Sequence, residues 1–189
     1  MTLSKRSTLA DVARCVATAL KSSQISAVLT GGACASLYTR GGYKSSDLDF
    51  IIQNAVSVAR LDGAMASVGF TRVGNQYEHP DAPFFVEFPA GPLGIGKDLH
   101  IRPVKYRIKG TVVSALSPTD SCRDRLAAFH HWNDRQALKA AVSIALRHRV
   151  SLNSIRRWSW REGAGSKCEE FMSEVKRLAT RRRARRGSR

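Results

Sequence analysis

The stretch Ser46-Asp47-Leu48-Asp49-Phe50-Ile51-Ile52 is the most informative part of this chain of 189 residues. It has the composition of a β-strand that carries two carboxylates within an apolar run. Residues i and i+2 of a strand point to the same face, so Asp47 and Asp49 are predicted to lie side by side. Adjacent carboxylates oppose each other's ionisation unless a cation lies between them, and Mg²⁺ binds such oxygen ligands together with substrate phosphates. The alternative is an incidental pair, with Asp47 at a turn or strand edge and Asp49 simply solvated.

A glycine pair precedes this stretch and strengthens the first interpretation. Residues 25–29 are apolar and partly β-branched, which predicts a buried strand, and Gly31-Gly32 follows almost directly. Glycine permits a positive φ and a close backbone approach, and residues 33–38 have the composition of a short helix. The start of such a helix offers N–H groups to an anion. The sequence therefore predicts a phosphate cradle beside the carboxylate strand, although a glycine pair alone is commonly just a tight turn.

In this order the motifs resemble those of the DNA polymerase β-like nucleotidyltransferase superfamily. Its minimal pattern is a hydrophobic strand, Gly-Gly or Gly-Ser, a short helix and then Asp-x-Asp on the next strand. The match is Leu29-Thr30-Gly31-Gly32 followed by residues 46–50, and the resemblance covers roughly residues 20–130. The family carries a third carboxylate on a later strand. Glu87, within Phe84-Phe85-Val86-Glu87-Phe88, is the candidate, although Asp is more usual there.

The resemblance implies a metal-dependent enzyme that moves a nucleotidyl group from a nucleoside triphosphate to a hydroxyl. The ion would be Mg²⁺ or Mn²⁺, and paired metals stabilise both the entering and the leaving oxygen of an in-line displacement. Glu87 would be either a further ligand or the base that accepts the hydroxyl proton. The implied catalytic and metal-binding residues are Asp47, Asp49 and Glu87, and the implied nucleotide-binding residues are Gly31, Gly32, Ser46, Lys97 and Arg123.

The segment Gly91-Pro92-Leu93-Gly94-Ile95-Gly96-Lys97 has the spacing of a P-loop but is not expected to be one. Asp98 stands where a P-loop has Ser or Thr, and the following residues include Pro103 and look extended rather than helical. Residues 89–97 are instead predicted to be a mobile loop near the site. Lys97 then either reaches a phosphate or is an ordinary surface lysine.

The pattern along the chain predicts an α/β (α+β) fold, in which a small mixed β-sheet core is flanked by helices and followed by a helical C-terminal region. Helices are expected at 9–20 and 56–68, short strands at 70–73 and 76–78, and a last strand at 111–116. Ser117 followed by Pro118 marks a helix start. We expect three segments: a nucleotidyltransferase core at 1–116, the helical region at 117–180, and a disordered arginine-rich tail at 181–189.

Several residues of the helical region could have either a chemical or a structural role. Arg123 or Arg125 could reach a triphosphate, as a basic residue does in nucleotidyltransferases of the AbiE toxin type, or could be an exposed helix arginine. His130 and His131 are adjacent and face different directions on a helix, so joint chelation is not expected. They are predicted to end a helix, with Asn133 or Asp134 capping the next one. Trp158 is predicted to lie in the core.

Charge is the strongest compositional signal. The formal net charge is +16, and residues 1–180 still carry +10 without the six arginines of the last nine residues. This favours a polyanionic partner, whose attraction would be salt-sensitive and independent of sequence. RNA, for example a tRNA end, is favoured as the acceptor over a cationic aminoglycoside, and a protein side-chain hydroxyl is the remaining alternative. A solubilising tail with nonspecific binding is the alternative.

The remaining expectations concern the location of the protein in the cell, the state of its cysteines and its biological setting. No apolar run is long enough to span a membrane, and no signal-type segment follows the first residues, so a cytoplasmic protein is expected. Four scattered cysteines, at positions 15, 34, 122 and 168, predict reduced thiols rather than a zinc site. By resemblance, the setting would be the toxin half of a toxin–antitoxin pair, with an antitoxin protein as partner. The rival function is a nonenzymatic nucleic-acid-binding or regulatory module on a decayed nucleotidyltransferase core.

Overall fold

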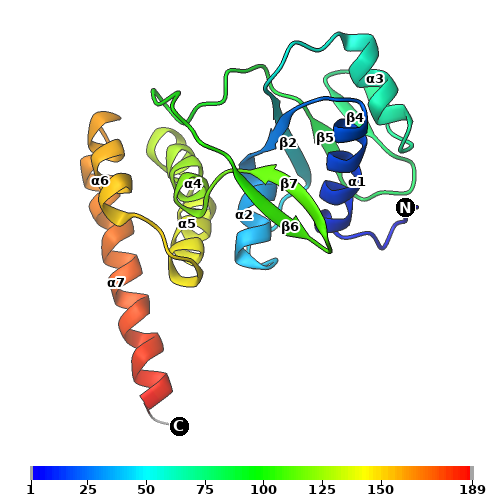
Figure 1. Ribbon diagram of the computed structural model, residues 1–189. Coiled ribbons are helices and arrows are strands. Elements are labelled where there is room, and N and C mark those ends of the chain that lie inside the picture. Colours follow the sequence, from blue (N-terminus) through cyan, green and yellow to red (C-terminus); the bar gives the residue numbers. More distant parts are fainter. Residues whose placement is uncertain (1, 188–189) are drawn as a thin grey trace.

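Seven strands form one mixed sheet at the centre of the molecule (Figure 1). The computed structural model describes residues 2–187, with side chains described up to residue 184. The strand order across the sheet is β3-β4-β5-β2-β1-β7-β6. The strands are β1 (Ala27–Leu29), β2 (Asp47–Ile52), β3 (Thr71–Val73), β4 (Gln76–Glu78), β5 (Phe85–Glu87), β6 (Val104–Ile108) and β7 (Thr111–Ala115).

Helices cover both faces of this sheet, and on one side further helices pack against the helix that covers it (Figure 1). The first three are α1 (Leu9–Ser22), α2 (Gly31–Thr39) and α3 (Val58–Ala66). The C-terminal four are α4 (Pro118–Trp132), α5 (Arg135–Arg147), α6 (Leu152–Arg161) and α7 (Gly165–Gly187). α1 and α3 pack on one face, α2 lies on the other, and α4 and α5 pack against α2 with α6 and α7 outside them. The predicted α/β fold with a helical C-terminal region is confirmed.

The side chains of β2 point alternately into the apolar core and toward a polar face of the sheet. Leu48 and Phe50 are almost fully buried, whereas Asp47 and Asp49 are half-buried. Antiparallel pairing with β1 sets Leu29 opposite Phe50, and parallel pairing with β5 sets Leu48 opposite Val86. Because a strand alternates its side chains, packing Leu48, Phe50 and Val86 into the core turns the carboxylates toward the other face.

Local signals at helix ends are also confirmed. Ser117 caps α4 by accepting a hydrogen bond from the N–H of Asp120, and Pro118 occupies the first turn. Asp134 caps α5 in the same way, and Asn133 ends α4 in the left-handed conformation. His130 is buried with its Nε2 3.0 Å from the Ser159 hydroxyl, and burial lowers its pKa to about 4. His130 therefore has the structural role that the sequence predicts.

The C-terminal end differs from the sequence expectation. α7 continues as a helix to Gly187, through most of the segment predicted to be disordered from residue 181, and residues 188–189 lie outside the described part. Arginine and alanine are good helix formers, which accounts for the continuation. The division at residue 116 stays a prediction, although the buried side chains of both parts form one continuous core. Within residues 2–187, no helix has the length and hydropathy needed to cross a bilayer.

The loop after β5 is fixed to the C-terminal helices rather than lying loose near the site. Leu93 and Ile95 are buried, and the buried indole N–H of Trp158 donates to the Ile95 carbonyl at 3.1 Å. The backbone N–H of Lys97 donates to the Glu162 carboxylate at 2.9 Å. The mobile covering loop expected from sequence is therefore replaced by an anchored one, and the Trp158 prediction is confirmed.

Arg123 completes this anchor and supplies a stability test. Its buried guanidinium pairs with Asp98 of the loop and, at 2.9 Å, with Asp120 of α4. We expect Arg123→Ala to lower the free energy of unfolding by about 2–4 kcal/mol, because it removes the buried guanidinium that neutralises Asp98 and Asp120. Arg156→Ala, which removes an exposed pair with Glu169, should cost less than about 1 kcal/mol. Urea unfolding measures both, and equal small effects would contradict the structural role of Arg123.

Candidate metal centre

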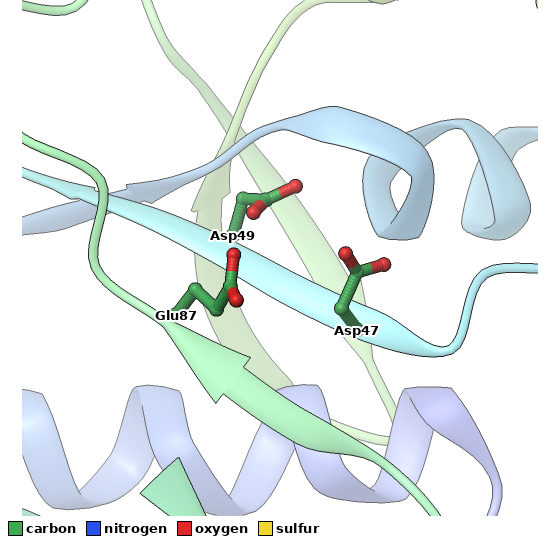
Figure 2. Close-up of side chains that lie close together, drawn as sticks. All are labelled: Asp47, Asp49 and Glu87. Atoms are coloured by element: carbon green, nitrogen blue, oxygen red, sulfur yellow. The ribbon is translucent and has the colours of Figure 1, made fainter. Parts of the chain in front are cut away.

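Three carboxylates converge where β2 and β5 lie side by side. Asp47 and Asp49 come from β2 and Glu87 from β5, and all three side chains project from the same side of the strands (Figure 2). Asp49 lies opposite Glu87 in the parallel register, so the pairing itself brings these two together. One carboxylate oxygen from each of the three residues lies within 4.8 Å of the others. We call these three residues the acidic triad.

The electrostatics of the triad suit a cation. The pKa of Asp49 is raised from 3.8 to about 6, first by burial and then by the charges of Asp47 and Glu87. Half-buried carboxylates that repel one another are stabilised by a metal that coordinates their oxygens. The donor set contains only oxygen and leaves room for phosphate ligands, which matches the preference of Mg²⁺ and Mn²⁺. The residues present therefore fit the metal that the sequence predicts.

The glycine pair lies directly against the triad. A Cβ atom built on Gly31 would lie 1.9 Å from Oδ2 of Asp49, and Gly31 has a φ of +62°. A Cβ on Gly32 would lie 2.4 Å from the Ser45 hydroxyl oxygen. Gly31 tolerates the positive φ, and both glycines lack the Cβ atom that would clash. The start of α2 can therefore approach the carboxylates closely. The first-turn N–H groups of this helix have no partner within the helix and are suited to an anion bound beside the metal.

Ser45, and not the predicted Ser46, is the serine that contacts the triad. Ser45 donates a hydrogen bond to Oδ1 of Asp47 at 2.6 Å, whereas Ser46 is exposed. Extending the alternation of β2 backwards by two residues would have found it, because Ser45, Asp47 and Asp49 share one parity.

Of the two arginines of α4 that the sequence offers, Arg125 is the one that acts on the charge of the triad. Arg125 is largely buried, donates to one oxygen of Asp124 at 2.8 and 3.0 Å, and lies close enough to Asp49 to lower its pKa. Arg123 instead has both ends of its guanidinium engaged by Asp98 and Asp120. Lys97 is exposed, and its backbone contacts Glu162 of the C-terminal region. The triad, Gly31 and Gly32 thus come together, while Lys97 and Arg123 belong to the loop anchor.

Comparison with solved structures identifies the type of fold. A crystal structure of an antigenic nucleotidyltransferase-like protein from Paracoccidioides brasiliensis matches with a TM-score of 0.55 and 20% identity, over 76% of this chain and 78% of that one. The solution structure of the antibiotic-resistance factor ANT(2'')-Ia matches with a TM-score of 0.51 and 10% identity, over 95% of this chain and 97% of that one. The chain has a nucleotidyltransferase-like fold. No protein-family model matches the sequence, and no curated protein is significantly similar to it.

In this nucleotidyltransferase-like fold, the charge of Asp49 should reduce the stability of the metal-free protein. Its raised pKa means that the folded state binds a proton more strongly than the unfolded chain, so metal-free stability should fall as pH rises from about 4 to about 6. At pH 7, Asp49→Asn should therefore raise the free energy of unfolding by about 1–3 kcal/mol in EDTA. Thermal melts with and without Mn²⁺ measure this, and Mn²⁺ should stabilise only the parent protein.

The exposed Asp81 provides the control, since Asp81→Asn should change neither the EDTA melt nor the response to Mn²⁺. A fall in the EDTA melting temperature of Asp49→Asn would contradict the electrostatic account.

Gly31→Ala tests the close approach of α2 to the triad. We expect it to weaken Mn²⁺ binding at least tenfold, because the new methyl group would displace the Asp49 carboxylate. Gly110→Ala is the matched control, since Gly110 also has a positive φ, of +86°, but a Cβ there meets no atom within 4 Å. Both variants carry backbone strain of about 1–2 kcal/mol. Calorimetric titration with Mn²⁺ separates them, and equal affinities would contradict the role assigned to Gly31.

Proposed function

We propose that this protein is a metal-dependent nucleotidyltransferase that transfers a nucleotidyl group from a nucleoside triphosphate to a hydroxyl acceptor. The acceptor oxygen would form a bond to the α-phosphorus while the bond to the β-phosphate oxygen breaks, and pyrophosphate would leave. The acidic triad facing the glycine start of α2 is the observation that carries this proposal. It combines candidate metal ligands with phosphate-binding N–H groups in one place.

Each residue of the site would have a distinct task. Asp47 and Asp49 would hold Mg²⁺ or Mn²⁺, which when bound supplies positive charge to the phosphate oxygens as the displacement proceeds. The N–H groups at Gly31 and Gly32 would bind phosphate oxygens, while Ser45 holds the Asp47 carboxylate in place. Glu87 would either complete the metal ligands or accept the proton of the acceptor hydroxyl.

The acceptor in this proposal is RNA, and the charge of the chain supports that choice. A formal charge of +16 attracts a phosphate backbone and repels cationic small molecules. The toxin role and an antitoxin partner follow only from the sequence resemblance. They predict that expression arrests growth of the host cell, that Asp47→Ala with Asp49→Ala abolishes the arrest, and that a cognate partner protein relieves it.

Nucleotide transfer is tested directly with labelled substrates. Purified protein is incubated with Mg²⁺ or Mn²⁺, each of the four labelled nucleoside triphosphates and total RNA, and label in RNA is measured. We expect transfer to fall at least about a hundredfold in the Asp47→Ala, Asp49→Ala variant, the scale on which electrostatic groups act in active sites. Asp81→Ala with Glu169→Ala, which removes two exposed carboxylates, should leave transfer unchanged.

The rival, a nonenzymatic nucleic-acid-binding module, makes the opposite prediction in the same assay. Such a module would bind RNA but would neither bind a nucleoside triphosphate nor transfer a nucleotidyl group. Its RNA binding should be unaffected by the loss of Asp47 and Asp49. That pattern would contradict the proposed enzyme.

A further inference from the structure

A strongly basic hollow lies where α2, α5 and α7 meet, away from the acidic triad. Its volume is about 620 Å³, and its lining contains four arginines, one histidine and no acidic residue. Arg40 comes from the C-terminal cap of α2, Arg147 and His148 from the end of α5, and Arg182 and Arg183 from α7. We refer to these five residues as the basic hollow.

The arginines of the basic hollow are not neutralised within the part of the chain whose side chains are described. Other arginines of the same helices form ion pairs with acidic partners on α7: Arg135 with Glu170, Arg156 with Glu169, and Arg177 with Glu174. Among residues 2–184, none of the four hollow arginines has a carboxylate partner within ion-pair distance. Because like charges gathered in a concave surface repel one another and focus a positive potential, the hollow is suited to an external anion.

Two contacts hold the hollow in shape. Arg182 donates to the Leu146 carbonyl at 2.8 Å and so ties α7 to the end of α5. Nε2 of His148 lies 2.7 Å from the Tyr38 carbonyl and ties α5 to α2. The three helix segments are thus joined by their own side chains. Arg40, Arg147 and Arg183 are exposed at the surface, and among the described side chains Arg147 uses only its Nε, which donates to the Ser143 hydroxyl at 3.3 Å.

The position of the hollow relative to the triad defines a path for a polymer. α2 begins against Asp49 at Gly31 and ends at the Arg40 cap, nine residues later. A helix of that length spans about 14 Å. A stacked nucleic-acid strand advances about 3.4 Å per nucleotide, so the two ends of α2 are separated by about four nucleotides.

We propose that the basic hollow binds the phosphodiester backbone of an RNA whose terminal hydroxyl enters the acidic triad. The hollow would hold phosphates about four nucleotides or more from that end. The placement of the RNA end rests on the proposed function, whereas RNA binding by the hollow does not. An anionic membrane surface fits less well, because the cations lie in a hollow between three helices and residues 179–184 of α7 contain no large apolar side chain.

Neutralising the hollow tests the inference. The test variant is Arg40→Asn, Arg147→Gln, Arg183→Gln, in which asparagine suits the left-handed φ of +54° at position 40 and Arg182 is kept for its contact with Leu146. The control variant is Lys21→Gln, Lys105→Gln, Arg107→Gln, which removes the same charge from a second hollow beside α1 and β6. Circular dichroism melts verify that both variants fold.

Binding is followed by fluorescence anisotropy with a labelled 20-nucleotide single-stranded RNA over a range of KCl concentrations. The test variant should bind at least tenfold more weakly, with a log–log salt slope smaller by about 2, because three phosphate contacts on a single strand are lost. The control variant should stay within about twofold of the parent protein. Equal losses in both variants, or no RNA binding by the parent protein at low salt, would overturn the inference.

Further arms separate other ligands and the proposed enzyme. Single-stranded DNA of the same sequence should bind no more tightly than RNA, and vesicles containing anionic lipid should not compete with RNA; either opposite result overturns the choice of RNA. Mn²⁺ and triphosphate binding should be unchanged in the test variant. Absence of nucleotidyl transfer by the parent protein would overturn the proposed function alone. RNA binding that is unchanged by neutralising the hollow would overturn this inference alone.

Discussion

The parallel pairing of β2 with β5 is the interaction on which the rest of the site depends. Its register sets Asp49 opposite Glu87, and burial of Leu48 and Val86 on the other face fixes that register. A slip by one residue would turn the carboxylates into the apolar core, which carries a large desolvation cost. The core of the sheet therefore determines the geometry of the acidic triad.

The same pairing makes the metal-free site unfavourable, and the surroundings only partly compensate. Burial, followed by the charges of three neighbouring carboxylates, raises the pKa of Asp49 to about 6, while Arg125 acts in the opposite direction. The glycine start of α2 adds N–H groups, and Gly31 can occupy its position only because it lacks a side chain. Retaining repelling charges at a half-buried position is typical of functional sites, where local stability is lower than it would be with neutral side chains.

Strong local signals made much of the fold and the triad predictable from sequence. The alternation of β2, the glycine pair and the Ser117-Pro118 helix start each follow from backbone geometry, and the structure contains all three. Tertiary contacts decided the rest. Arg123 and Arg125 lie about 200° apart around a helix, so the sequence shows that they face different ways but not which one faces the site. Likewise, only tertiary contacts, such as those of Trp158 with Ile95 and of Glu162 with Lys97, show that the loop after β5 is anchored.

The molecule thus combines an acidic site at the start of α2 with a basic surface at its end. This separation of charge matches a reaction in which a cation and a triphosphate meet the end of a polyanion. The most direct test is a crystal structure with Mn²⁺ and a nonhydrolysable nucleoside triphosphate, using anomalous scattering to locate the metal. The account predicts an anomalous peak bound by Asp47 and Asp49, with phosphate oxygens at the N–H groups of Gly31 and Gly32. Metal and nucleotide bound elsewhere, with the triad empty, would contradict it.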